Sequence, residues 1–133
     1  MIEVLRAYEK RYPSIRAVPS LPRREYLGLL RVASVLVGNS SSGIIDAPSF
    51  GLPAVNIGTR QEGRERGNNI IGVGHDRKEI VAGIRKALTD RKFRAAAKKC
   101  VNPYGDGKAG LRIAEVLGSL KITPRLLQKK IAY

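Results

Sequence analysis

A short apolar segment that runs into a turn of small polar residues is the feature that most constrains the fold of this chain. Residues 32–37 are uncharged, rich in valine and aliphatic except for Ser34, which predicts a buried strand. Ser40, Ser41 and Ser42 follow, and residues 43–50 predict a helix capped by one of these serines. The first N–H groups of a helix lack partners within it and carry partial positive charge, so the segment predicts an anion site. Ordinary helix capping is the alternative explanation, although it needs one serine and not three.

A second short apolar strand, at 54–57, ends in a polar loop that contains three arginines and three glycines. This arginine loop spans residues 58–67. In open α/β sheets, the loops that follow the carboxyl ends of neighbouring parallel strands converge on one ligand crevice. The serine turn and the arginine loop are therefore predicted to face a common anion. The alternative is that the arginines simply form a solvated surface loop.

Strands and helices alternate along the rest of the chain, which predicts an α/β layer fold with a parallel sheet. Asp76 is a predicted N-cap, with Glu79 three residues later as in a capping box. In the helix at 109–120, we expect Leu111, Ile113, Ala114, Val116 and Leu117 to face inward. The predicted helices lie at 1–11, 23–32, 43–50, 77–88, 93–99, 109–120 and 126–132, and the predicted strands at 15–18, 34–37, 54–57 and 70–73.

Composition limits the classes of function. The 133 residues allow one domain at most, and the formal net charge of +14 suggests a polyanion partner. However, the basic residues are scattered, and the few aromatics do not alternate with them as base-stacking platforms require, so nucleic acid is not the expected partner. The single cysteine, Cys100, provides neither a disulfide nor a metal cluster and is expected at a helix end. Without a long apolar run or a signal-peptide pattern, we expect a cytoplasmic protein with no membrane contact.

Several segments, read in order, resemble the C-terminal part of the UDP-N-acetylglucosamine 2-epimerases, above all their hydrolysing branch. The resemblance covers nearly the whole chain. Its core is a stretch of more than thirty residues, from Val37 before the serine turn to Asn69 after the arginine loop. The matching segments are Ser20-Leu21-Pro22 with Glu25-Tyr26-Leu27, then VGNSSSGIIDAPSFGLPAVNIGTRQEGRERGNN, NPYGDGKA and the closing Leu127-Gln128-Lys129-Lys130.

The resemblance implies a fold of two Rossmann-like domains, as in GT-B glycosyltransferases, with the nucleotide in the cleft between them. Residues 1–133 would be the C-terminal nucleotide-binding portion, without the N-terminal domain. The expected fold is therefore an incomplete Rossmann-like parallel sheet with helices on both faces. The expected ligand is UDP or UDP-N-acetylglucosamine, and neither a cofactor nor a metal is implied.

The resemblance also assigns roles to individual residues. Ser40 and Ser41, with Ser42 and Gly43 beside them, would bind the diphosphate, and Arg60 would reach the same side of the cleft. Leu21, by its backbone, and Tyr26, by its ring, would line the uracil. Asp46 occupies a position where the family has a glutamate that accepts from the ribose hydroxyls, and its carboxylate is one methylene shorter. Tyr26 could instead belong to the core of its helix, and Asp46 could favour the helix start electrostatically.

The family's proton-transfer residues lie in the N-terminal domain, so no catalytic residue is expected in this chain. His75 does not lie where the family has its histidine, and we expect it to be a surface or capping residue. The predicted function is the UDP-binding portion of an epimerase that is inactive alone, completed by a companion chain or associating with itself through an open sheet edge. The alternatives are a non-catalytic sugar-nucleotide-binding module and a basic polyanion binder.

Overall fold

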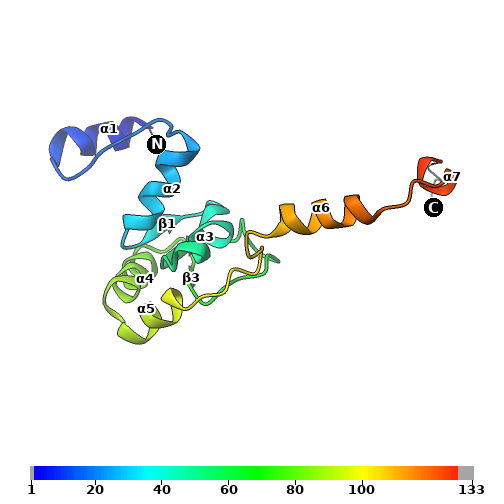
Figure 1. Ribbon diagram of the computed structural model, residues 1–133. Coiled ribbons are helices and arrows are strands. Elements are labelled where there is room, and N and C mark those ends of the chain that lie inside the picture. The colour runs from blue at the N-terminus through cyan, green and yellow to red at the C-terminus, as the bar shows by residue number, and fades with distance from the viewer. Residues whose placement is uncertain (1, 129–133) are drawn as a thin grey trace.

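The computed structural model describes residues 2–128 of this chain. At its centre lies a parallel sheet of β1 (Leu36–Gly38), β2 (Ala54–Ile57) and β3 (Ile70–Val73), in the order β1-β2-β3 (Figure 1). Leu36 pairs with Ala54 and Ala54 with Ile70, so the strands start in step and their carboxyl ends meet at one edge. The second and third strands have the bounds predicted from the sequence, and the first begins two residues later than predicted.

Helices cover both faces of this sheet, which confirms the predicted α/β class. On one face, Gly43 in α3 (Ser42–Ile45) packs on Leu36 and Ala54. On the other, Gly83 in α4 (Arg77–Thr89) packs so closely on Val55, Ile71 and Val73 that a Cβ would lie 2.9 Å from the Val73 side chain. Small residues therefore set the spacing between each helix and the sheet.

A second group of buried side chains joins α2 (Arg23–Val32) to the 3-10 helix η1 (Ala47–Phe50). Leu30, Ala47 and Leu52 are buried together there, with Tyr26 and Leu27 packed against them. The helix α5 (Arg91–Lys98) also packs against η1, and the backbone of Lys98 lies close to Gly51, the residue that follows η1. The 3-10 helix η1, which also contacts α3, is thus packed against both α2 and α5.

The helix predicted over 43–50 is broken in two, because α3 ends at Ile45 and η1 starts at Ala47. Pro48 explains the break, since it has no N–H and its ring would clash with the carbonyl four residues earlier in an α-helix. The prediction of a strand over 15–18 is wrong. None of the described strands lies alongside this segment to complete a ladder, and the Ala17 N–H instead donates to the Glu9 carboxylate at 2.9 Å.

The predicted ends of α4 and α5 need small corrections. Asp76 caps α4, accepting from the N–H groups of Lys78 and Glu79. Glu79 does not complete a capping box, because its carboxylate accepts from the Gly74 N–H, two residues before the cap. The helix predicted from Phe93 begins at Arg91, and Asp90 caps it.

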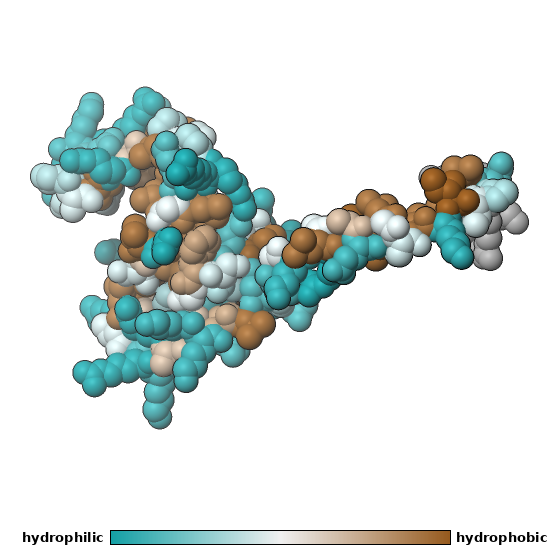
Figure 2. All heavy atoms as spheres, in the orientation of Figure 1, coloured by the Kyte–Doolittle hydropathy of each residue, from teal (hydrophilic) through white to brown (hydrophobic). Residues whose placement is uncertain are grey.

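Helices at both ends of the chain project from this body, α1 (Ile2–Arg11) on one side and α6 (Ala109–Ser119) with α7 (Pro124–Leu127) on the other (Figure 1). The inward orientation expected for α6 is wrong. Apolar residues lie exposed along this arm (Figure 2), and Leu117, for example, is 64% exposed. The apolar stripe predicts the helix correctly, but in the described chain α6 lies against no other element.

The helix α7 overlaps the helix predicted at 126–132 only at Leu126 and Leu127, because it begins at Pro124 and has its C-cap at Gln128. Residues 129–133 lie outside the described part of the chain. Within residues 2–128, no helix has both the length and the apolar character needed to cross a membrane.

Candidate functional site

The serine turn leaves the carboxyl end of β1 and offers several hydrogen-bond donors. The Ser40 hydroxyl accepts from the Ser42 N–H at 3.3 Å, and Ser41 occupies the N-cap of α3 without a side-chain capping bond. Among the contacts of residues 2–128, the backbone N–H groups of Ser40 and Ser41 have no acceptor. Because α3 is only one turn long, these N–H groups and hydroxyls, and not a long helix dipole, are what the turn presents to an anion.

The arginine loop reaches this turn through two side chains. Arg60 donates to the Asn39 carbonyl at 3.2 Å, and the buried Gln61 donates to the same oxygen at 2.9 Å. Gly58 and Gly63 make the required bends with positive φ angles. The structure therefore brings Arg60 beside the serine turn, as the sequence predicts.

The other two arginines of the loop do not take part in this contact. Arg66 donates to the Gln61 carbonyl at 3.1 Å and lies near Gly72 in β3, and Arg64 is exposed. The structure therefore favours the alternative, a solvated surface loop, for Arg64 and Arg66, and only Arg60 lies at the serine turn.

Four side chains from α2, α3 and the residue that follows α3 form one hydrogen-bonded network, which we call the Asp46 network. The Tyr26 hydroxyl donates to the Ser42 hydroxyl at 2.6 Å, and Ser42 donates to Asp46 at 2.8 Å. Arg23 forms an ion pair with the other Asp46 oxygen at 2.9 Å. Ser42 is only 8% exposed, so its hydroxyl is part of the interior here. Sequence reasoning missed Arg23, whose pattern resembled any other exposed pair of basic residues.

Two predicted site residues, Leu21 and Gly43, are close in sequence to members of this network. Leu21 is half-buried two residues before α2, and Gly43 is buried at the start of α3 against the sheet. Tyr26 is half-buried and packs on the cluster of Leu30, Ala47 and Leu52, so it is both part of the core edge and a member of the network.

Two asparagines hold the polypeptide that carries the serine turn. Asn69, which is 0% exposed, donates to the carbonyls of Gly43 and Leu52 at 3.2 and 3.0 Å. Asn102 donates to the Ile45 carbonyl at 2.9 Å and to the Ser49 hydroxyl. Sequence reasoning missed both roles. The signal was their place within the two segments, GNN and NPYGDGKA, that also carry the family resemblance.

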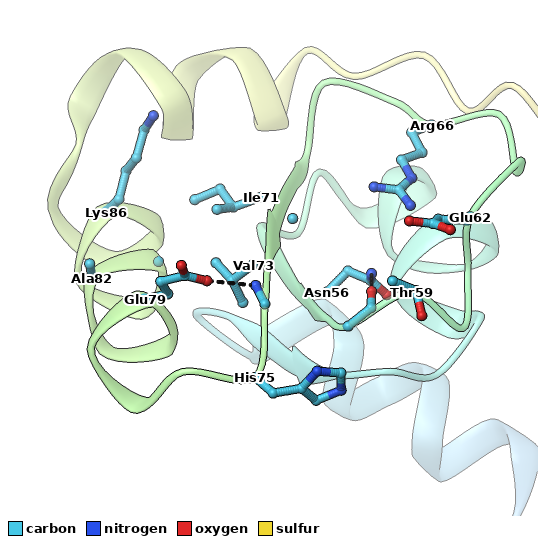
Figure 3. A pocket seen from close by; sticks show the side chains of 14 residues that line it. Asn56, Thr59, Glu62, Arg66, Ile71, Val73, His75, Glu79, Ala82 and Lys86 are labelled. Carbon is cyan, nitrogen blue, oxygen red and sulfur yellow. Dashed lines mark hydrogen bonds between the residues drawn. The ribbon is translucent and has the colours of Figure 1, made fainter.

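A cavity of about 700 Å³ runs along β3 between the arginine loop and α4 (Figure 3). His75 lies at its edge, exposed, with its imidazole over Gly58, and Asp76, not His75, caps α4. Arg66, Glu62 and Lys86 line it as well, so its charges are mixed. The serines are not among its lining residues. Among the described residues, no three His, Cys, Asp or Glu side chains are grouped as a metal site would require.

A parallel sheet with helices on both faces, and with the candidate residues on loops at the carboxyl ends of its strands, defines an open, Rossmann-like α/β protein. The sequence profile of the UDP-N-acetylglucosamine 2-epimerase family matches residues 1–118, and the chain belongs to this family.

Relatives agree with this assignment, and a solved structure shares the fold. The chain is 40% identical over 131 residues to a UDP-N,N'-diacetylbacillosamine 2-epimerase (hydrolyzing) of Legionella pneumophila, which covers 98% of this chain and 33% of that protein. It is 42% identical over 79 residues to a UDP-N-acetylglucosamine 2-epimerase of Neisseria meningitidis, covering 59% of this chain and 21% of that one. A crystal structure of a Listeria monocytogenes protein assigned to the UDP-N-acetylglucosamine 2-epimerases has the same fold, with a TM-score of 0.70 and 20% identity over 81% of this chain and 30% of that one. The chain thus spans a third or less of the length of these relatives.

Proposed function

We propose that this chain is the C-terminal, nucleotide-binding portion of a UDP-N-acetylglucosamine 2-epimerase, and that it binds the diphosphate of a UDP-sugar at the serine turn. The observation that carries the proposal is the contact of Arg60 with the Asn39 carbonyl, in a chain whose family match includes both segments. This contact brings a guanidinium to the residue that precedes Ser40, at the start of the serine turn. Fixed N–H donors and a guanidinium are the groups that bind phosphate oxygens most strongly.

The chemistry assigned to the site is stabilisation of a leaving group. In an elimination that cleaves the bond between the sugar and UDP, negative charge develops on the departing phosphate oxygen. Donors that already point at that oxygen lower the barrier without reorganising. The serine turn and Arg60 would serve this purpose, and the ring of Tyr26 and the backbone of Leu21 would hold the uracil.

Proton transfer at the sugar requires a base and an acid that this proposal places outside residues 1–133. The full chain alone is therefore expected to form no N-acetylmannosamine from UDP-N-acetylglucosamine. Two features support a companion polypeptide or self-association, namely the edge of β1 that faces away from β2 and the exposed apolar residues of α6. A cytoplasmic location stays a prediction.

The names of the relatives differ in the sugar and, for a Campylobacter jejuni protein named for both GDP and UDP, in the nucleotide as well. The Legionella and Neisseria relatives are named for different UDP-linked sugars, and UDP is what these two names share. We therefore assign UDP as the ligand of this chain. We propose that residues outside this chain, on the other side of the cleft, select the sugar.

Calorimetric titration of the full chain with UDP tests the proposal. Binding should be weakened at least about tenfold when Ser40→Ala and Ser41→Ala are combined. His75→Ala, a matched change at the same edge of the sheet, should leave it unchanged. Equal affinity in the serine variant and the parent chain would refute the site. If the chain is instead a general polyanion binder, heparin should compete with UDP, and heparin binding should fall steeply between low and moderate salt.

A further inference from the structure

The arginine loop begins with a tight turn that carries Arg60 and Gln61. The Glu62 N–H donates to the Thr59 carbonyl at 2.8 Å. A bond of this kind closes a β-turn, whose two central residues are here Arg60 and Gln61. Both side chains donate to one acceptor, the Asn39 carbonyl, at 3.2 and 2.9 Å. The β-turn is therefore joined to the start of the serine turn through a single oxygen.

The two donors to this oxygen differ in exposure. Gln61 is 3% exposed, whereas the other residues from 59 to 66 are all exposed. Its amino group must be the part that faces Asn39, because an amide oxygen has no hydrogen to donate to a carbonyl. The Oε1 atom of Gln61 has no hydrogen-bond partner among the described residues, so within residues 2–128 the bond to Asn39 is what orients this buried side chain. Gln61 is thus the buried anchor of the β-turn, and Arg60 is its exposed member.

The shared acceptor allows Arg60 to leave without a loss of pairing. A carbonyl oxygen has two lone pairs and can accept from both side chains at once. When the Arg60 guanidinium turns to a phosphate oxygen, Gln61 still donates to the Asn39 carbonyl, and that acceptor keeps a partner. The guanidinium gains by the exchange, since its hydrogen bonds to a charged phosphate are stronger than those to a neutral carbonyl.

We infer that Gln61 is a positioning residue, which fixes the β-turn at the serine turn and lets Arg60 exchange the Asn39 carbonyl for the diphosphate. The inference rests on the proposed function, because it concerns how that nucleotide site obtains its guanidinium. Its physical basis is preorganisation. An arginine on an unanchored loop loses backbone and side-chain freedom when it binds, whereas the bond from Gln61 to Asn39 fixes the loop beforehand.

Gln61→Met tests the inference, because methionine is of similar length but cannot donate to Asn39. The affinity for UDP, measured by calorimetric titration of the full chain, should fall about tenfold. When Arg60→Met is already present, the same change should weaken UDP by less than about threefold, because Gln61 acts through Arg60. Thr59→Val, at the exposed first position of the same β-turn, is the matched control and should leave the affinity unchanged.

The outcomes separate this inference from the proposed function. A further tenfold loss when Gln61→Met is added to Arg60→Met would overturn the inference, because independent contributions add. Unchanged affinity in Gln61→Met, together with a loss in the variant that combines Ser40→Ala and Ser41→Ala, would overturn the inference alone. No heat with UDP in the parent chain would refute the proposed function, and the inference with it.

A measurement on the parent chain decides the matter if Gln61→Met does not fold. In a nuclear magnetic resonance titration of the ¹⁵N-labelled full chain with UDP, the side-chain signal of Arg60 should shift. The side-chain amide of Gln61 should exchange its hydrogens more slowly than that of the exposed Asn68, both with and without UDP, since its bond to Asn39 persists. If the N–H signals of the serine turn saturate while Arg60 does not shift, or while the Gln61 amide loses its protection, the inference is overturned.

Discussion

Replacing Asn69 by alanine should strongly destabilise the chain. The Asn69 amide group is 0% exposed and donates to the carbonyls of Gly43 and Leu52. Alanine leaves both carbonyls without this donor, and each unsatisfied buried acceptor costs about 1–3 kcal/mol. Partial relaxation around the small cavity reduces the sum, so we expect the free energy of unfolding to fall by about 3 kcal/mol.

Urea denaturation followed by circular dichroism measures this loss, with linear extrapolation to water. Asn68→Ala, at the exposed neighbouring position, should change the free energy of unfolding by no more than about 0.5 kcal/mol. Asn69→Asp keeps the size of the side chain but replaces the donor by an acceptor, so it should destabilise at least as much as Asn69→Ala. A loss below about 1 kcal/mol in Asn69→Ala would refute the view that this amide holds the start of α3.

Further predictions concern packing, pH and the arm. A Cβ at Gly67 would overlap the Cys100 sulfur, so Gly67→Ala should lower the free energy of unfolding by about 1–3 kcal/mol in urea denaturation. Adding Cys100→Ala should restore most of this loss, and a double variant as unstable as Gly67→Ala would contradict the packing argument. The Phe93 N–H donates to the Asp90 carboxylate and lowers the pKa of Asp90 below its ordinary value of 3.8. This stabilisation is present above pH 3.8 and is lost as the pH falls through the lowered value, so on acidification the melting temperature should fall further in the parent chain than in Asp90→Asn. Parallel curves would exclude this effect. Leu117→Glu on exposed α6 should change stability by no more than about 0.5 kcal/mol and reduce self-association in light scattering, and a loss above about 2 kcal/mol would mean that Leu117 is buried.

The sequence predicts the parts of the fold that depend on local chemistry. The strands at 54–57 and 70–73 are short apolar runs after turn residues, and both appear with the predicted bounds. The segment at 15–18 has a similar pattern but forms no strand, because a strand also requires a neighbour. The stripe of α6 likewise identifies an apolar face without identifying what covers it.

The candidate site shows the same division. The hydroxyl-rich turn and the approach of Arg60 follow from the order of strands and loops, which sequence patterns reveal. The pairing of Arg23 with Asp46 and of Asn102 with Ile45 joins residues 23 and 57 positions apart. No local pattern encodes such contacts, because many exposed arginines and asparagines have the same neighbours in sequence. Pro48 is a local signal for the break between α3 and η1, and a single helix over 43–50 is incompatible with it.

The most direct test of the central claim is a nuclear magnetic resonance titration of the ¹⁵N-labelled full chain with UDP. The account predicts that the backbone N–H signals of Ser40 and Ser41 and the side-chain signal of Arg60 shift together and saturate with one dissociation constant. Shifts confined to residues around His75 and α4, or no shifts at millimolar UDP, would contradict it.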